Sequence, residues 1–241
     1  MDGFIDIHSH ILPEIDDGSK SMEQTIHMVK LAYEEGIRTM VATPHFHEGS
    51  YEHPPSILEY KLQKVKEAVK DIVPEMNILL GSEIYYSHEI VRLLRRNRMP
   101  AIAGTKYILV EFSTMADYRY IKNGLQEFVM EGYLPVIAHV ERYVDVTKDL
   151  GRVMELIDMG VCIQVNADSI TGETGRYYHG IAKKLLKYQY IHIIATDTHS
   201  DGARAPRIRK CFDYVVKKYG DEYAKELLID NQRKILSDQY I

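Results

Sequence analysis

Seven short apolar runs, each followed by residues at helical spacing, constrain the fold of this chain more than any other feature of its sequence. Each run is nearly continuous in apolar residues, which is typical of strands in a parallel sheet that is buried on both faces. The runs are Phe4–Ile7, Thr39–His45, Asn77–Glu83, Tyr107–Glu111, Leu134–His139, Cys162–Asn166 and Ile191–His199. Right-handed crossovers then either close the sheet into a barrel or leave it doubly wound.

Capping signals and apolar spacing predict helices between these runs. Ser21–Gln24 has the form of a capping box, and helical spacing continues from there to Gly36. Two closing helices are expected around Phe212–Val216 and Tyr223–Ile229. The 241 residues contain no linker rich in Gly, Ser or Pro, and they match the size of a single α/β barrel. We therefore expect one domain over residues 1–241.

Residues of the types that bind metals follow most of the apolar runs. The first run leads into Asp6-Ile7-His8-Ser9-His10, and the side chains of His8 and His10 share one face of a strand because they are two residues apart. The complete set comprises His8, His10, Asp17, His45, Glu83, Glu111, His139, Asp197 and His199. In a barrel the C-terminal ends of all strands meet at one mouth, whereas an open sheet spreads them along an edge. These residues therefore favour a barrel with a metal site at the C-terminal ends of its strands.

Nine such groups exceed the needs of a single ion. Four carboxylates and five imidazoles, without a thiolate, suit two or three divalent cations such as Mn²⁺, Fe²⁺, Zn²⁺ or Mg²⁺. Two cations about 3.5 to 4 Å apart activate a shared water and hold the attacking and leaving oxygens of a phosphoryl transfer. The set therefore indicates hydrolysis of a phosphoester.

Two arginines near the same strand ends support this chemistry. Arg142 stands three residues after His139, and Arg204 stands five residues after His199. A guanidinium group presents a planar fork of donors that matches phosphate oxygens and neutralises charge in the transition state. We therefore expect Arg142 and Arg204 to be catalytic.

The remaining histidines are interpreted as structural or surface residues. They are His27, His47, His53, His88, His179 and His192. His47 comes nearest to a place in the site, because it lies two residues after His45, but it is not included among the ligands.

Composition and missing motifs exclude other classes of protein. The net charge of −5 argues against nucleic-acid or membrane-surface binding, and no run of eighteen apolar residues occurs, so we expect a soluble, cytoplasmic protein without stable membrane insertion. Asp168 and Lys217 lie six residues after Cys162 and Cys211, where the C-x₅-R pattern of a cysteine phosphatase needs arginine. Nucleotide-binding and serine-hydrolase loops are also absent.

An ordered series of motifs covers nearly the whole chain. It runs Asp6-x-His8-x-His10, Asp16-Asp17-Gly18, Thr43-Pro44-His45, Gly81-Ser82-Glu83-Ile84, Glu111-Phe112, His139-Val140-Glu141-Arg142-Tyr143 and Asp197-Thr198-His199. This series resembles the polymerase and histidinol phosphatase (PHP) family of metal-dependent phosphoesterases. Within that family it is most similar to the bacterial tyrosine-protein phosphatases that are encoded with capsule and exopolysaccharide synthesis systems.

The resemblance implies a distorted seven-stranded β/α barrel and a three-metal centre that is usually active with Mn²⁺. It places the nine residues above on the family's metal ligands, and Arg142 and Arg204 on its phosphate-side arginines. The implied substrate is the tyrosine-rich tail of a bacterial tyrosine kinase. Because a phenol has a pKa near 10, its phenolate leaves without strong general-acid help, so no acid is assigned.

Two other functions remain compatible with the sequence. A small-molecule phosphatase of the histidinol-phosphate type would use the same metals. A non-catalytic metal-binding module would bind the ions without hydrolysing any phosphoester. The identity of the native metal, of the substrate protein and of the oligomeric state is left open by the sequence.

Overall fold

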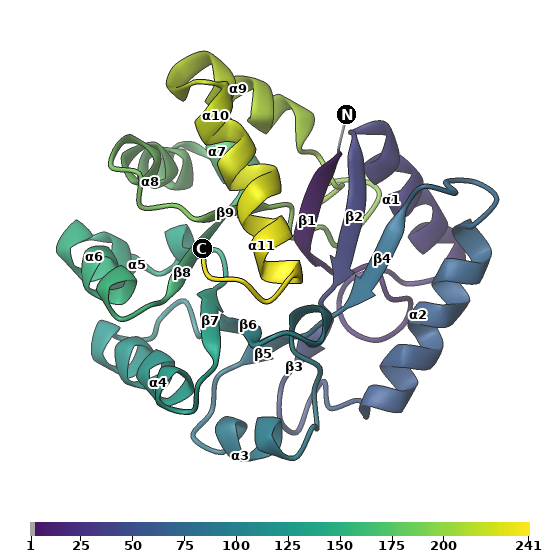
Figure 1. Cartoon of the computed structure of the whole chain (residues 1–241), viewed down its shortest axis with the longest axis horizontal. Coiled ribbons are helices and arrows are strands. Elements are labelled where there is room, and N and C mark those ends of the chain that lie inside the picture. Colours follow the sequence, from purple (N-terminus) through teal and green to yellow (C-terminus); the bar gives the residue numbers. More distant parts are fainter. Residues whose placement is uncertain (1–2) are drawn as a thin grey trace.

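The computed structural model describes residues 3–241, in which short parallel strands alternate with helices (Figure 1). The strands are β1 (Phe4–Ser9), β2 (Ile37–Ala42), β3 (His45–Phe46), β4 (Asn77–Leu80), β5 (Glu83–Tyr85), β6 (Tyr107–Glu111), β7 (Leu134–Ile137), β8 (Cys162–Asn166) and β9 (Ile193–Ala195). The helices are α1 (Met22–Glu34), α2 (Pro55–Val69), α3 (Ile90–Arg95), α4 (Tyr118–Met130), α5 (Val144–Thr147), α6 (Leu150–Asp158), α7 (Ala167–Thr171), α8 (Arg176–Lys187), α9 (Arg209–Tyr219), α10 (Asp221–Lys225) and α11 (Asn231–Leu236). Three short helical turns are η1 (Ile102–Gly104), η2 (Val140–Arg142) and η3 (Glu226–Asp230), the last with π-helical geometry.

Two of the seven predicted strands are each divided into two pieces. The structure contains a sheet with the order β1-β2-β4 and a second sheet with the order β3-β5-β6-β7-β8-β9, and every pairing is parallel. The break between β2 and β3 falls at Thr43-Pro44, where proline has no N–H to donate, and the break between β4 and β5 falls at Gly81-Ser82. The strand positions themselves agree with the seven apolar runs.

The two sheets close into a distorted barrel, as predicted. Backbone hydrogen bonds join the end of β1 to the segment after β9, from Asp197 N to His8 O at 3.0 Å and from His10 N to Thr198 O at 2.8 Å. On the other side β4 and β6 are not paired with each other, and η1 packs against both. The barrel is therefore irregular where β4 and β6 separate.

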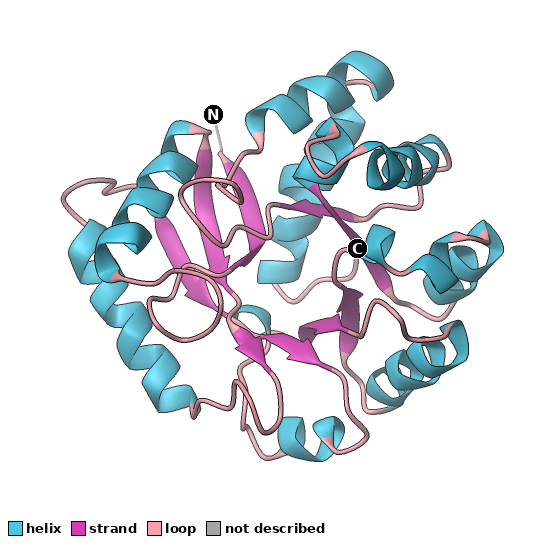
Figure 2. Ribbon diagram, turned by 180° about the vertical axis from the view of Figure 1, so that it is seen from behind, coloured by secondary structure: helices cyan, strands magenta, loops and turns pink. Residues whose placement is uncertain are grey.

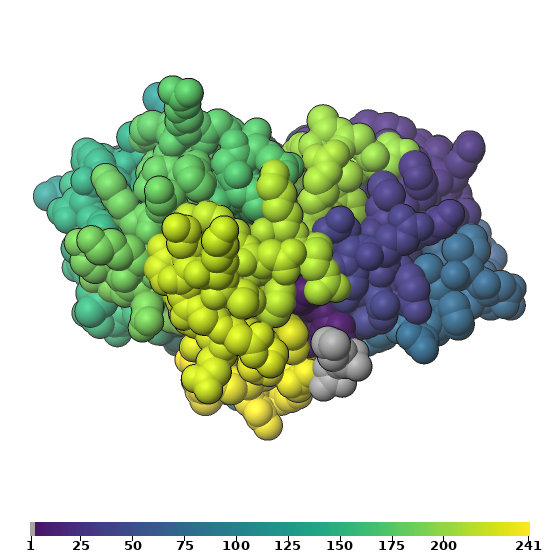
Figure 3. Space-filling view, turned by 90° about the horizontal axis from the view of Figure 1, so that it is seen from above, coloured from purple at the N-terminus to yellow at the C-terminus, as the bar shows by residue number. Residues whose placement is uncertain are grey.

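Two hydrophobic clusters fill the structure. One lies inside the barrel and includes Ile7, Val41 and Leu109, and a larger one lies between the strands and the surrounding helices. The C-terminal helix α11 closes the end of the barrel at which the strands begin, because its Ile235 is fully buried in the inner cluster. Figure 1 looks at this end, and Figure 3 shows the C-terminal segment beside the N-terminal strand. The opposite end, where the strands finish, faces the viewer in Figure 2.

Local signals that the sequence predicted are present. The side chain of Ser21 accepts a hydrogen bond from Gln24 N at 3.1 Å and caps α1, while the side chain of Gln24 accepts from Lys20 N at 2.8 Å instead of from Ser21 N, so half of the predicted capping box is formed. Cys162 and Cys211 are both free and buried, and burial raises the pKa of Cys162 to about 12. Neither thiol is therefore suited to act as a nucleophile. Within the described residues, none of the helices combines the length and apolar character needed to cross a membrane.

Candidate metal centre

The nine residues predicted as metal ligands come together at the end of the barrel where the strands finish. His8 lies within β1 and His10 directly after it, while His45, Glu83 and Glu111 lie on β3, β5 and β6. The other members, Asp17, His139, Asp197 and His199, lie in the segments that follow β1, β7 and β9. Parallel strands direct all of these positions to one mouth, and that is why residues up to 191 positions apart in the sequence meet there.

Two imidazole rings at the end of β1 present their Nε2 atoms to one point. These atoms of His8 and His10 lie 3.3 Å apart, and they are 3.2 Å and 3.1 Å from Oε2 of Glu83. On the far side of the rings, Nδ1 of His8 lies 3.2 Å from Oε1 of Gln164, and Nδ1 of His10 lies 2.7 Å from Oδ2 of Asp16. Donation from Nδ1 leaves the lone pair on Nε2, so both rings are oriented to bind a cation beside Glu83.

Asp16 holds one side of the cluster in place. Besides His10, its carboxylate accepts hydrogen bonds from the backbone N–H groups of His45 and Gly18, both at 2.9 Å. Burial alone would raise the pKa of Asp16, but the interaction with His10 outweighs it and lowers the pKa to about 2. Burial would lower the pKa of His10, but the Asp16 carboxylate raises it to about 9. A cation that binds His10 therefore displaces a proton.

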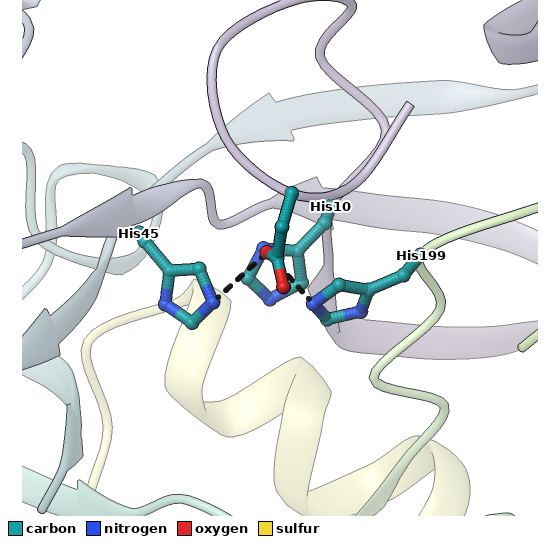
Figure 4. A group of neighbouring side chains, drawn as sticks. His10, His45 and His199 are labelled. Carbon is teal, nitrogen blue, oxygen red and sulfur yellow. Dashed lines mark ion pairs between the residues drawn. The ribbon is translucent and has the colours of Figure 1, made fainter. Parts of the chain in front are cut away.

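Asp17 reaches the cluster from the loop between β1 and α1. Its Oδ1 lies 3.3 Å from Nε2 of His45 and 3.4 Å from Nε2 of His199, and Figure 4 shows the rings of His10, His45 and His199 gathered around this carboxylate. Nδ1 of His199 faces the backbone oxygen of Asp197 at 2.9 Å, so Nε2 of His199 is again the nitrogen available to a cation.

Glu83 connects these residues to the other side of the mouth. Nδ1 of His45 lies 3.2 Å from Oε2 of Glu83 and 3.0 Å from Oε1 of Glu111. Nε2 of His139 lies 2.9 Å from Oε1 of Glu83 and 3.8 Å from Oε2 of Glu111. Glu83 thus contacts imidazoles that come from three different strand ends.

Three overlapping groups of side chains have possible donor atoms within 4.8 Å of one another. The groups are His10, Asp17, His45 and His199; His8, His10, Glu83 and Asp197; and His45, Glu83 and Glu111. Eight of the nine predicted residues belong to at least one group. His139 belongs to none of them, although it contacts Glu83.

These donor atoms fit divalent cations. Oε2 of Glu83 is buried and makes no hydrogen bond of good geometry within the described residues, although three imidazole nitrogens surround it. Burial favours protonation of Glu83, but the imidazoles, His8 foremost, hold its pKa well below the usual range. A buried, charged and unsatisfied oxygen is costly, and a cation would remove that cost. Nitrogen and oxygen donors without sulfur suit borderline or hard divalent ions.

Asp197 links the cluster to both predicted arginines. Its Oδ1 lies 3.4 Å from Nε2 of His8, while its Oδ2 lies 3.0 Å from Nη2 of Arg142 and 2.8 Å from Nη2 of Arg204. Burial would raise the pKa of Asp197, but His8 and the two guanidinium groups hold it far below the usual range. The arginine side chains remain 27% and 38% exposed, so both can also reach a molecule at the mouth.

Two site residues adopt a left-handed backbone conformation, which is uncommon outside glycine. The φ angle is 35° at His139 and 53° at Asp197. Backbone hydrogen bonds hold both residues, from His139 N to Oε1 of Gln164 at 2.8 Å and from Asp197 N to His8 O at 3.0 Å. Such conformations concentrate at functional sites, where the surrounding structure fixes them.

The remaining histidines lie outside the three groups. His53 and His179 bond to the backbone oxygens of Ile15 and Ile170, both at 2.9 Å. The ring of His47 stacks on Tyr85 instead, with 4.3 Å between ring centroids.

Sequence reasoning missed the polar side chains of β8. Oε1 of Gln164 accepts from both His8 and His139, and the side-chain amide of Asn166 donates to Oδ2 of Asp197 at 2.8 Å. Both residues are fully buried, at alternate positions of an otherwise apolar strand. Two buried amides on one face of a strand are a signal that could have revealed their supporting role.

Comparisons with known proteins cover almost the entire chain. The family model described as "Capsular polysaccharide synthesis, CpsB/CapC" matches residues 4–237. The chain is 38% identical to the tyrosine-protein phosphatase CpsB of Streptococcus pneumoniae, with 98% of this chain and 100% of the relative aligned. Crystal structures of YwqE from Bacillus subtilis and CpsB from S. pneumoniae, described as unique metal-dependent tyrosine phosphatases, match it with a TM-score of 0.92 at 30% identity, covering 98% of this chain and 96% of the other. The phosphotriesterase from Mycobacterium tuberculosis matches with a TM-score of 0.62 at 13% identity, which shows a shared fold alone.

Proposed function

Because this chain belongs to the capsular polysaccharide synthesis CpsB/CapC family, we propose that it is a metal-dependent protein-tyrosine phosphatase acting in capsular or exopolysaccharide synthesis. The observation that carries this proposal is the orientation of His8 and His10 toward Glu83. Both rings present Nε2 to a buried carboxylate oxygen that lacks a hydrogen bond. This arrangement supports the binding of a cation between the two rings and the carboxylate.

The proposed ligands are the nine residues of the mouth, with His139 assigned through its contact with Glu83. When bound, divalent ions activate a water molecule and stabilise negative charge on phosphoryl oxygens. We propose two or three ions, with Mn²⁺ as the first choice because the family resemblance implies it; Fe²⁺, Zn²⁺ or Mg²⁺ would also suit donors that are nitrogen and oxygen alone.

The two arginines are the side chains that would bind and orient the phosphoryl group. Arg142 and Arg204 each pair with Oδ2 of Asp197, which fixes both side chains. Their remaining N–H groups can therefore point at a phosphoryl group without a further loss of side-chain entropy. In this proposal they donate to the phosphoryl oxygens and hold the phosphorus in line with the attacking water. The phenolate departs without a dedicated acid, because a phenol is a far better leaving group than an alcohol.

The substrate is proposed to be a phosphotyrosine protein, namely a bacterial tyrosine kinase that controls polysaccharide synthesis. The family description and the tyrosine-protein phosphatase relatives support this partner. We also propose that residues 1–241 act as one phosphoesterase domain, since the family model spans nearly all of them. The two free, buried cysteines suit the reducing environment of the cytoplasm, where such a kinase tail would be encountered.

Phosphate release from a phosphotyrosine peptide tests the proposal. Protein stripped of metal with a chelator is measured before and after addition of Mn²⁺, and we expect activity only after the addition. Turnover of histidinol phosphate in preference to the peptide would assign a small-molecule phosphatase instead. Metal binding without hydrolysis of either compound would assign a non-catalytic module.

A further inference from the structure

A hollow of about 320 Å³ adjoins the candidate metal centre, between the end of β5 and the loop that joins β6 to α4. Its lining includes Tyr85, Tyr86, Met115, Ala116 and Tyr120. Ser113 and Asp117 line it as well, so five of the seven lining side chains are aromatic or apolar and two are polar. The hollow therefore combines an aromatic surface with a polar edge.

The hollow lies immediately beside two of the proposed ligands. Tyr85 comes two residues after Glu83 on β5 and pairs in register with Glu111 on β6. Tyr86 N donates to Glu111 O at 2.9 Å, which fixes the strand end between the hollow and the mouth. The ring of His47 stacks on Tyr85 with an interplanar angle of 15°, so an aromatic wall continues from the hollow toward His45.

The floor of the hollow is rigid. Tyr86 is 2% exposed, and its ring packs against Phe112 and Tyr120 with centroid distances of 5.1 Å and 5.2 Å. Its hydroxyl donates to Oε2 of Glu127 at 3.0 Å. Gly124 lets α4 approach this ring, since a Cβ atom there would lie 2.7 Å from Tyr86. The aromatic surface is therefore formed before any ligand arrives.

The outer edge of the hollow is open and adaptable. Met115 is 90% exposed, which leaves a flexible apolar side chain in water beside an aromatic floor. The nearby carboxylate of Asp117 accepts from Tyr120 N at 2.9 Å and caps α4, so it already has a structural role. Methionine next to aromatic rings is typical of surfaces that bind apolar side chains.

We propose that this hollow binds an apolar or aromatic side chain next to the phosphotyrosine in the substrate polypeptide. The inference rests on the proposed function, because a phosphotyrosine held at the mouth brings its neighbours with it. Consecutive residues of an extended chain are about 3.4 Å apart, and the hollow begins at Tyr85, which pairs in register with the proposed ligand Glu111. A neighbour in the same polypeptide thus reaches the hollow without a second binding event, and the hollow selects the sequence around the phosphotyrosine.

Peptides with phenylalanine or alanine on both sides of phosphotyrosine test this inference, together with p-nitrophenyl phosphate. For the metal-loaded protein we expect kcat/KM to be about tenfold higher for the phenylalanine peptide, as for one well-buried aromatic contact. Met115→Glu should remove that preference and leave turnover of p-nitrophenyl phosphate unchanged. Met130→Glu is the matched control, because Met130 is 78% exposed at the end of α4 and does not line the hollow.

Binding of the same two peptides with a non-hydrolysable phosphonate in place of the phosphate separates this inference from the proposed function. Tighter binding of the phenylalanine peptide, lost in Met115→Glu, would support the hollow even if no substrate were hydrolysed. Equal affinity and equal kcat/KM for the two peptides would overturn it while leaving phosphatase activity intact. An altered oligomeric mass in Met115→Glu with unchanged peptide preference would also overturn it, since the hollow would then bind a second copy of the chain.

Discussion

Nη2 of Arg204 lies 2.8 Å from Oδ2 of Asp197, and this contact ties a proposed phosphate-binding side chain to a proposed metal ligand. Arg142 shares the same oxygen at 3.0 Å, while the other oxygen of Asp197 faces His8. If either guanidinium swung into solvent, the buried carboxylate of Asp197 would lose one of its two cationic partners. The arginines are therefore held in place by a proposed metal ligand. Variants of an arginine and variants of the residues around the ligands should nevertheless differ in effect, because the first should change turnover and the second should change metal affinity.

Arg142→Ala should lower kcat for a phosphotyrosine peptide by about 100-fold, because a charged donor to the transition state is lost. Bound metal should remain, since Arg204 still pairs with Asp197. Steady-state kinetics and metal analysis of the same preparation check both parts. Arg207→Ala is the control, because Arg207 is exposed and pairs with Glu173 instead of with Asp197. An unchanged kcat in Arg142→Ala would remove this residue from the catalytic set.

Asp16→Asn should weaken metal binding by about 10- to 100-fold, because a carboxylate that orients a ligand histidine is lost. An asparagine oxygen still accepts a hydrogen bond but carries no charge to favour the Nδ1 proton of His10. Calorimetric titration of metal-free protein with Mn²⁺ measures the dissociation constant of the variant and of the unaltered protein directly.

Asp201→Asn is the matched control for that experiment. Asp201 contacts His27 at 2.8 Å, nearly the distance between Asp16 and His10, but this pair is partly exposed, and the side chain of Asp201 bonds to Gln24 and His27 and to no proposed ligand. Its replacement should leave Mn²⁺ affinity unchanged. Equal losses in the two variants would mean that the charge of the protein as a whole, and not the orientation of His10, governs binding.

The barrel was predictable because each strand is buried on both faces and so appears as an apolar run. The divisions between β2 and β3 and between β4 and β5 were not predictable from those runs. They depend on contacts between segments, such as the hydrogen bond from Gly81 N to Ala42 O at 2.8 Å, which no local pattern reveals. Within the run Thr39–His45 the break falls at Thr43-Pro44, and Pro44 is the local residue that marks it.

The proposed ligands could be predicted from the sequence for a related reason. A strand end followed by His, Asp or Glu is a local pattern, and parallel topology brings such ends together. The residues that orient the ligands lack this signal. Gln164 lies 156 residues from His8, within an apolar run that already had a structural explanation. The two amides at alternate positions of β8 mark it as unusual, and the pairing of β7, β8 and β9 determines which residues Gln164 contacts.

Acid should weaken the junction between α4 and α6 through Asp145. This carboxylate accepts from Tyr118 N at 2.8 Å and pairs with Lys148 and Arg152, and its pKa is lowered to about 2, chiefly by the bond to Lys148. A lowered folded-state pKa gives stability that is complete above the unfolded value near 3.8 and is lost as the pH falls through about 2. Asp145→Asn should therefore melt below the unaltered protein at pH 7, with a difference that shrinks between pH 4 and pH 2. The melting temperatures of the unaltered protein and of Asp145→Asn, measured from pH 7 to pH 2, test this prediction. Asp71→Asn is the control, because Asp71 is exposed after α2. A difference in melting temperature that did not change with pH would exclude the titration of Asp145 as its cause.

Gly124→Ala should destabilise the protein by about 1 to 3 kcal/mol, although alanine is the better helix former. Alanine in an exposed helix interior normally stabilises by about 0.5 to 1 kcal/mol. At position 124 the added Cβ would lie 2.7 to 2.9 Å from three ring atoms of Tyr86, whose ring is packed and cannot withdraw freely. A Cβ atom added at Gly180, within α8, would have no heavy atom within 4 Å, so Gly180→Ala should show the ordinary stabilisation. Urea unfolding of the two variants measures the opposite signs, and stabilisation by both would mean that the aromatic floor of the hollow yields more readily than its packing indicates.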